Sequence, residues 1–356
     1  MKLGIIGLPG SGKSTIFEAL TQSILPEGHK GEFEALTQSI LPEGHKGENR
    51  MGTIPVPDPR LAVLTEMYKP KRTIYAQVEY FLPGMRGQKK DQKIWNQVRD
   101  CDALIHVIRN FSVYGLEKPR PYHDFQAMDQ ELIFADLVVV EKKLESVELD
   151  RRRNKKTPSQ EILLLNQCLK HLENETPLRK CPDLASAHHL RGYAFLSAKP
   201  MLVMFNNEDE DDAIPEAADL TSTENCTVIR GKLEQELAQM SIEEAEEFLS
   251  EFNITASAMD RVIKQSYELL GLISFFTVVS DEVKAWTVKK ETPAVDAAGV
   301  IHTDMQKGFI RAEVISYEDL ITAGTYHEAR KKGNVRLEGK TYKVQDGDII
   351  TFRFNV

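Results

Sequence analysis

A glycine-rich turn near the N-terminus constrains the fold of this chain more than any other feature. The residues from Gly7 to Thr15 read GLPGSGKST, which has the spacing G-x-x-x-x-G-K-S. A short apolar run from Leu3 to Ile6 precedes the turn, and a helix-like segment begins at Ser14. A strand that continues through such a turn into a helix directs several backbone N–H groups and the positive end of the helix dipole at one point. The segment therefore predicts a phosphate-binding loop.

The side chains at the end of the turn narrow the predicted ligand to a nucleoside triphosphate. Lys13 can reach the β- and γ-phosphates, and the Ser14 hydroxyl is the predicted metal ligand for Mg²⁺, the predicted cofactor. The pattern leaves open which base is bound and whether hydrolysis occurs. A chance glycine turn is the alternative, and the order of strand, turn and helix argues against it. The phosphate-binding residues predicted in the turn are Gly7, Pro9, Gly10, Ser11, Gly12, Lys13, Ser14 and Thr15.

Composition and charge argue against several classes of protein. At 356 residues the chain is long enough for two or three domains. A formal net charge of −9 argues against coating of nucleic acid by bulk charge, although local basic patches can still bind RNA. The four cysteines lack metal-binding spacing and are typical of reduced thiols in a cytosolic protein. No apolar run has the length of a membrane span, and the N-terminus does not resemble a signal peptide. We therefore expect a cytoplasmic protein with no membrane partner.

Strands and helices are predicted to alternate after the turn. Segments 73–81 and 103–111 indicate strands, whereas 61–68 and 91–100 indicate helices. This alternation predicts an α/β fold with a largely parallel, doubly wound sheet. Residues 199–206 indicate a further strand and 241–270 a helical segment. From Ser274 onward, short strands alternate with turn glycines, which predicts a small β-grasp-like domain.

A helical hairpin is predicted between residues 126 and 172. Two apolar sets at helical spacing flank the charged stretch DRRRNKKTPSQ at 150–160. The basic tip of the hairpin is either a solvated loop or a contact for RNA or another partner.

One stretch near the N-terminus is duplicated. FEALTQSILPEGHKGE occurs at 17–32 and again at 33–48 without a mismatch. Two identical copies indicate a recent duplication or an error in the sequence record, since solenoid folds need several diverged repeats. We predict an exposed, poorly ordered insertion with no chemistry at His29 or His45.

Several longer motifs together resemble the YchF subfamily of Obg-related P-loop nucleotidases over nearly the whole chain. They are PDPRL at 57–61, RDCDALIHVIR at 99–109, ELIFADLVVVEKKLE at 131–145, AWTVKKETPAVDAAGVIHTDMQKGFIRAEVISYEDL at 285–320 and EGKTYKVQDGDIITFRFNV at 338–356. The resemblance implies a cytosolic nucleotidase that binds ATP or GTP and acts near the ribosome or translation. It also implies four segments. These are the first part of a P-loop domain (1–122), an inserted helical hairpin (123–195), the second part of the P-loop domain (196–272) and a TGS β-grasp domain (273–356).

The residues that such nucleotidases use for hydrolysis are partly missing. Where the resemblance implies D-x-x-G, this chain has FLPG at 81–84, so it keeps Gly84 as a phosphate-binding residue and lacks the carboxylate that holds Mg²⁺ through water. Met85 follows, where an apolar residue is normal for the subfamily, and the position of its substitute histidine falls near Tyr114. Thr53 is the nearest candidate for the first switch threonine. Because phosphoryl transfer depends on positioning and charge neutralisation, we expect slow or negligible hydrolysis.

The base-reading motif leaves ATP and GTP both open. The subfamily has N-x-x-E where related GTPases have N-K-x-D, and the matching base-binding residues here are Asn206, Asn207 and Asp209. A carboxylate at 209 can accept two hydrogen bonds from guanine, and adenine offers no such pair. The ATP preference of the subfamily favours the other base. A solvated acidic loop is the alternative, and the third base-contact loop, near 230–232, departs from the subfamily's small-residue pattern.

Two functional hypotheses follow. The first is a weak Mg²⁺-dependent nucleotidase that switches the hairpin and the TGS domain on a ribosome-related partner. The second is a degenerate nucleotide-, RNA- or ribosome-binding module without hydrolytic activity. A small-molecule kinase shares the phosphate loop but lacks a recognisable acceptor site. In the TGS segment, His302 and Asp304 are either a structural turn pair or part of a binding surface, and four residues are basic enough to contact RNA: Arg311, Lys331, Lys332 and Arg336.

Overall fold

The computed structural model describes residues 1–22, 48–84, 91–115, 117–153, 159–216, 220–251, 257–279 and 281–355. The chain divides into two compact units, one formed by Met1–Ile54 and Glu79–Val262 and the other by Pro55–Val78 and Ile263–Val356. This division groups residues 55–78 with the C-terminal residues. The four segments bounded at 122, 195 and 272 stay a prediction. Most of the duplicated stretch, including His29 and His45, lies outside the described residues.

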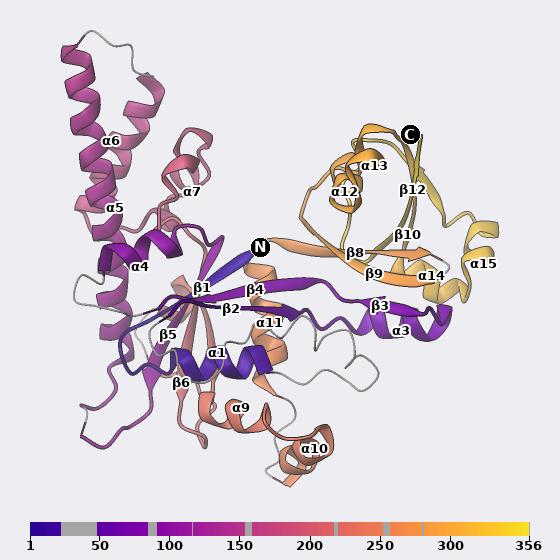
Figure 1. The fold of residues 1–356 in the computed structure, drawn as a ribbon, viewed down its shortest axis with the longest axis horizontal. Coiled ribbons are helices and arrows are strands. Elements are labelled where there is room, and N and C mark those ends of the chain that lie inside the picture. The colour runs from indigo at the N-terminus through magenta and orange to yellow at the C-terminus, as the bar shows by residue number, and fades with distance from the viewer. Residues whose placement is uncertain are drawn as a thin grey trace. The chain divides into compact units, whose positions relative to one another are not determined.

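The first unit is built on a six-stranded sheet with the order β2-β4-β1-β5-β6-β7 (Figure 1). Its strands are β1 (Lys2–Ile6), β2 (Arg50–Pro55), β4 (Gln77–Leu82), β5 (Ala103–Asn110), β6 (Met201–Asn207) and β7 (Asn225–Ile229). β1 pairs in parallel with β4 and β5, and the parallel pairing continues from β5 to β6 and from β6 to β7. The central strands are buried along nearly their whole length, as expected for a parallel sheet covered on both faces. The predicted α/β fold is therefore confirmed.

Nine helices of the described residues belong to this unit or begin in it. They are α1 (Lys13–Gln22), α4 (Asp91–Val98), α5 (Pro121–Arg152), α6 (Ser159–Glu173), α7 (Pro182–Ala185), α8 (Leu220–Thr223), α9 (Gly231–Leu237), α10 (Ile242–Glu251) and α11 (Ala258–Leu269), which continues into the second unit. Several of them, such as α1, α5 and α9, bury apolar residues. Phe17 and Leu20 of α1 are buried, and residues three apart lie on one face of a helix. No described helix combines the length and the apolar composition that a bilayer crossing requires.

α5 and α6 lie side by side and form the predicted helical hairpin (Figure 1). Val140 of α5 and Leu165 and Cys168 of α6 belong to one buried apolar cluster. The cluster continues into the segment after α6, which contains 3₁₀ turns at Leu178–Lys180 and His188–Tyr193. Residues 154–158 of the basic tip lie outside the described residues.

The second unit contains a mixed sheet with the order β11-β10-β12-β8-β9-β3. Its elements are α3 (Pro59–Tyr68), β3 (Arg72–Ile74), β8 (Leu272–Val279), β9 (Glu282–Lys289), α12 (Ala294–Ile301), α13 (Thr303–Lys307), β10 (Phe309–Ser316), α14 (Tyr317–Ala323), α15 (Tyr326–Lys331), β11 (Arg336–Glu338) and β12 (Asp348–Phe354). Small residues of α12 pack in one apolar cluster with the sheet residues Phe275, Val314 and Ile350. The short strands predicted from Ser274 onward are confirmed.

The prediction of a single strand at 73–81 is wrong. The structure divides it into β3, which pairs in parallel with β9 of the second sheet, and β4, which pairs with β1 of the first. Between them, the carbonyl of Ala76 accepts a hydrogen bond from the amide of Val56 at 2.8 Å. The propensity of residues to form a strand does not indicate which strand they pair with. A continuous run of strand-forming residues therefore gave no sign that the chain passes from one sheet to the other. The predicted helical segment 241–270 likewise comprises two helices, α10 and α11.

A buried carboxylate connects α5 to the rest of the first unit. Asp136 is fully buried and accepts hydrogen bonds from Arg99 Nη1 at 2.8 Å, from the amide of Leu196 at 3.0 Å and from the amide of Ser197 at 2.7 Å. Burial raises the pKa of this carboxyl, and the Arg99 guanidinium and the two amides oppose the rise. A buried charge held in this way depends on each of its partners.

We expect Asp136→Ala to lower the free energy of unfolding by about 3 to 5 kcal/mol, because the variant leaves the Arg99 guanidinium buried without its partner. Urea-induced unfolding followed by circular dichroism measures this change. Glu141→Ala, at an exposed position of the same helix, is the matched control and should change stability by no more than about 0.5 kcal/mol. A loss below about 1 kcal/mol for Asp136→Ala, as for an exposed ion pair, would contradict the argument.

Candidate functional site

The phosphate-binding loop lies between β1 and α1, where the sequence predicts it. Gly7, Gly10 and Gly12 have positive φ angles of 150°, 80° and 90°, which side chains rarely tolerate. A Cβ atom at Gly7 would lie 2.3 Å from the carbonyl oxygen of Val107 in β5. The loop therefore needs glycine both for its curvature and for its close approach to the neighbouring strand.

Two polar side chains of the loop are buried in an arrangement suited to an anion. The Nζ of Lys13 donates to the carbonyl oxygens of Gly7 and Leu8 at 2.8 and 2.7 Å, so the ammonium closes the curve of the loop. Burial lowers the pKa of Lys13 to about 8. The buried hydroxyl of Ser11 has no hydrogen-bond partner among the described residues. An unpaired buried hydroxyl beside a buried ammonium fits an anionic group such as a phosphate.

The remaining predicted loop residues lie at its outer edge. Pro9 and Gly10 are exposed, and Thr15 is partly exposed. Ser14 is also exposed and occupies the first turn of α1. Mg²⁺ usually takes one or two protein ligands together with phosphate oxygens and water. The Ser14 hydroxyl fits the role of one such ligand, and when bound the ion would neutralise charge on the phosphates. Within the described ranges, no three His, Cys, Asp or Glu side chains cluster as metal ligands.

Asn206, at the end of β6, anchors the loop to a second loop. Its Nδ2 donates to the carbonyl of Ser11 at 3.1 Å, and its Oδ1 accepts from the amide of Gly231 at 2.9 Å. A Cβ atom at Gly12 or at Gly231 would lie 2.2 Å or 2.7 Å from the Asn206 amide. Both glycines are therefore required to admit this side chain.

The other residues of the predicted base motif differ in their availability. Asn207 is 3% exposed, accepts from Asn110 Nδ2 at 2.9 Å and donates to the carbonyl of Ala213 at 2.8 Å. Asp209 is partly exposed; its Oδ1 accepts from the amide of Leu233 at 3.2 Å, and its Oδ2 lies 3.8 Å from Lys232 Nζ. The buried Asn207 amide is thus bonded through both its oxygen and its nitrogen, whereas the partly exposed Asp209 carboxylate retains acceptor capacity.

The strand beside the phosphate loop ends without a carboxylate. Phe81 is 4% exposed and lies in the apolar cluster beneath the sheet, with Lys2 Nζ 4.1 Å from its ring centre. The amide of Gly84 donates to Asn49 Oδ1 at 2.9 Å. Thr53 lies within β2, Tyr114 is fully exposed, and Met85 lies outside the described residues. The structure does not place Thr53 on a loop that faces the phosphates.

Sequence analysis missed one titratable residue beside the loop. His106 of β5 is 1% exposed, stacks on Phe125 with ring centres 5.7 Å apart, and has no hydrogen-bond partner for either nitrogen among the described residues. Burial lowers its pKa to about 3, and repulsion from Arg179 and Lys13 contributes. The imidazole is therefore neutral at physiological pH. The only signal in the sequence was a histidine inside an otherwise apolar strand.

A glycine loop that connects the first strand of a parallel sheet to a helix, anchored by an asparagine from a later strand, defines a P-loop nucleotide-binding protein. Residues 272–355 match the family model YchF-GTPase_C, described as a protein of unknown function (DUF933). The chain is 37% identical over 373 residues to the ribosome-binding ATPase YchF of Bacillus subtilis, and 99% of each chain is covered. It is 35% identical to the protein of the same name from Escherichia coli O157:H7, with 100% of this chain and 99% of that one covered.

Solved structures agree with this assignment. The YchF GTPase of Schizosaccharomyces pombe superposes with a TM-score of 0.83 at 28% identity, covering 99% of this chain and 97% of that one. A GTP-binding protein from Pyrococcus horikoshii OT3, at 18% identity and a TM-score of 0.58, shares the fold. The chain belongs to the YchF family.

The pKa of Lys13 predicts how nucleotide affinity depends on pH. Bound phosphates stabilise the ammonium and raise its pKa above the value of about 8 that it has in the free protein. Binding therefore takes up a proton above this pH, and we expect triphosphate affinity to fall by up to about tenfold per pH unit. Titration of a fluorescent triphosphate between pH 7 and 10 measures this effect.

Lys13→Ala is the control for this titration and should bind weakly with little change above pH 8. The lowered pKa of Lys13 adds stability as the pH rises from about 8 to 10.5, whereas the raised pKa values of the buried Cys101 and Cys168 thiols oppose it at the alkaline end. Circular dichroism at each pH therefore separates loss of affinity from loss of fold. Equal affinities at pH 7 and 10 in the unsubstituted protein would show that Lys13 is not a phosphate ligand.

Proposed function

We propose that this protein binds a nucleoside triphosphate with Mg²⁺, hydrolyses it slowly and acts at the ribosome. The observation that supports binding most strongly is the phosphate loop anchored by Asn206, which contains the buried Lys13 and a Ser11 hydroxyl that has no partner in the part of the chain that the structure describes. The names of the bacterial relatives, ribosome-binding ATPases, support the ribosome as partner and favour a nucleotidase over a module without hydrolysis.

The proposed hydrolysis is slow because binding and catalysis use different residues. The proposed ligands of the phosphates are the residues predicted in the loop, together with Gly84 at the end of β4. Phe81 supplies no carboxylate to hold Mg²⁺ through water, and Thr53 is part of a strand. Phosphoryl transfer then depends on the loop, Lys13 and the metal alone, with a poorly oriented water.

The proposed nucleotide is ATP or GTP. Asp209 supports GTP, because its carboxylate has free lone pairs that can accept from guanine N1–H and N2–H₂. The amide of Leu233 and the ammonium of Lys232 compete for the same carboxylate, which weakens that preference. The bacterial relatives are named ATPases and the yeast structure is named a GTPase. Titration with both triphosphates, with and without Mg²⁺, separates these possibilities.

We expect slow phosphate release from ATP or GTP that requires Mg²⁺ and that Lys13→Ala abolishes, because the variant removes the charge that neutralises the β- and γ-phosphates. A coupled phosphate assay at saturating nucleotide measures the rate. Lys170→Ala, at an exposed position of α6, is the control for loss of a lysine. If the unsubstituted protein binds nucleotide but releases phosphate no faster than Lys13→Ala, hydrolysis is excluded and binding alone remains.

The proposed ribosome contacts are the hairpin tip and basic residues of the C-terminal unit. Arg151 and Arg153, at the end of α5, are exposed. In the C-terminal unit Arg311 and Lys332 are exposed, whereas Lys331 pairs with Glu328 at 2.9 Å. Arg336 also has acidic neighbours, since it lies 3.9 Å from the carboxylate of Asp348. His302 accepts from the amide of Asp304 at 3.2 Å and caps α13, which supports the structural role of that pair.

We expect the double variant Arg151→Glu and Arg153→Glu to weaken co-sedimentation with ribosomes by about tenfold or more at low salt, because reversal replaces attraction to RNA phosphates by repulsion. Sedimentation through a sucrose cushion at several salt concentrations measures this. Lys142→Glu with Lys170→Glu, at exposed positions along the hairpin, matches the change in charge. Equal losses in both double variants would show that net charge, and not the tip, determines binding.

A further inference from the structure

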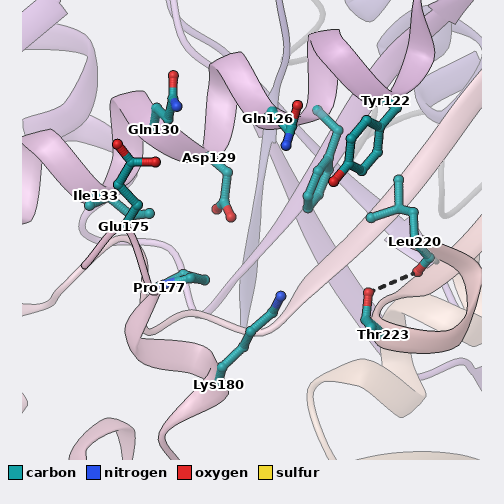
Figure 2. Close-up of a pocket in the computed structure, with 11 residues that line it drawn as sticks. Tyr122, Gln126, Asp129, Gln130, Ile133, Glu175, Pro177, Lys180, Leu220 and Thr223 are labelled. Atoms are coloured by element: carbon teal, nitrogen blue, oxygen red, sulfur yellow. Dashed lines mark hydrogen bonds between the residues drawn. The ribbon is translucent and has the colours of Figure 1, made fainter. Parts of the chain in front are cut away.

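A cavity of about 290 Å³ lies at the base of the helical hairpin. One face of α5 lines it, together with the turn after α6 and the short helix α8 (Figure 2). The residues that line it include none of the phosphate loop and none of the predicted base motif. Its volume is close to the lower limit of small-molecule sites, about 300 Å³.

A carboxylate fixed by an ion pair lines this cavity. The side-chain oxygens of Asp129 accept from Nη1 and Nη2 of Arg179 at 2.7 and 3.0 Å, and the residue is 9% exposed. Arg179 also pairs with Glu224 at 2.9 Å and lies 5.9 Å from the ring centre of Phe125. One guanidinium therefore serves two carboxylates, which leaves a surplus negative charge, and each Asp129 oxygen keeps lone pairs for another donor.

A second carboxylate, that of the exposed Glu175, lies on the same side of the cavity. Glu175 follows α6 with a φ of 54°, a left-handed position where glycine or asparagine is usual. Figure 2 shows its carboxylate close to Gln130 and Ile133 of α5, with Asp129 beside them. This conformation closes the C-terminus of α6, because the amides of Glu175 and Thr176 donate to the carbonyls of Leu172 and His171 at 3.0 and 2.9 Å.

The other side of the cavity carries a positive charge and a hydroxyl. Figure 2 shows the ammonium of Lys180, an exposed residue of the 3₁₀ turn Leu178–Lys180, extending toward the cavity, and the hydroxyl of Tyr122 directed into it from the first turn of α5. Apolar surface from Phe125 and Leu220 completes the wall. The lining is thus acidic on one side, cationic on the other and partly apolar.

We propose that this cavity binds a small zwitterion of the α-amino acid type. Its ammonium group pairs with Asp129 and Glu175, its carboxylate accepts from Lys180 and Tyr122, and an aliphatic side chain packs on the apolar wall. A simple anion would meet two carboxylates and a simple cation would meet the lysine, so a ligand with both charges complements the lining better than either. This site is separate from the proposed nucleotide site and does not depend on it.

Isothermal titration calorimetry of the full chain with leucine tests the proposal. We expect binding with a dissociation constant in the millimolar range or below. We also expect at least about tenfold weaker binding of 4-methylpentanoate, which lacks the ammonium group, and of 3-methylbutylamine, which lacks the carboxylate. Binding of the amine as tight as that of leucine would show a cation site and overturn the proposal. So would the absence of leucine binding at tens of millimolar.

Two variants connect the binding to the residues named. Glu175→Asn removes the carboxylate with a residue that tolerates the left-handed backbone, so we expect an unchanged or higher melting temperature and loss of leucine binding. Lys180→Gln should remove the preference for leucine over 3-methylbutylamine. Glu173→Gln and Lys170→Gln, at exposed positions of α6 that do not line this cavity, should bind leucine normally.

Titration of the same variants with nucleotide separates this proposal from the nucleotide function. We expect unchanged nucleotide binding in Glu175→Asn and Lys180→Gln. If both variants bind leucine like the unsubstituted protein, the ligand occupies another place and the assignment to this cavity is wrong.

Discussion

The side-chain amide of Asn206 is the contact on which the nucleotide site depends. It joins the phosphate loop, 195 residues earlier in the chain, to the loop that begins α9, 25 residues later. Both hydrogen bonds are buried, and a buried amide that loses one partner destabilises the fold by its desolvation free energy. Since Gly12 and Gly231 both leave room for this amide, the three segments determine one another's positions. The pairing of β6 with β5, and of β5 with β1, brings the three together.

The sequence predicted those parts of the site whose function resides in a contiguous pattern. The phosphate loop is such a pattern, because strand, turn and helix are neighbours in the chain and the glycines report the backbone directly. The division of residues 73–81 between two sheets was not predictable, since it depends on which distant strand accepts each half. The resemblance implied Asn206 and Asn207 as base-binding residues, and the motif could not indicate that Asn206 bonds to Ser11 and Gly231 or that Asn207 bonds to Asn110 and Ala213. Local patterns specify elements, whereas partners depend on tertiary packing.

Phe81, at the position where the resemblance implies a metal-holding carboxylate, is part of the apolar core. Phe81 packs in the same apolar cluster as Ile6, Val98 and Leu104, and the register pairs it with Gly4 of β1. A carboxylate in that environment would lose hydration without a metal to compensate it. The structure therefore does more than omit a ligand, because its packing now favours an aromatic ring at the position. Binding and hydrolysis have separate physical bases here, and a change in one need not alter the other.

The presence of His106 in β5 is not explained by packing alone. The ring stacks on Phe125, and a phenyl ring could make the same contact without two buried nitrogens that lack partners among the described residues. Those nitrogens carry a desolvation cost that an apolar residue would avoid. Lys13 and Arg179 both disfavour protonation of the imidazole. Phosphates bound at Lys13 would weaken one of these two repulsions, so the electrostatic potential at His106 depends on the nucleotide site as well as on the ion pairs at the base of the hairpin. The histidine is thus a neutral polar group close to two cationic side chains, Lys13 and Arg179. Packing requirements alone would favour an apolar residue at this position.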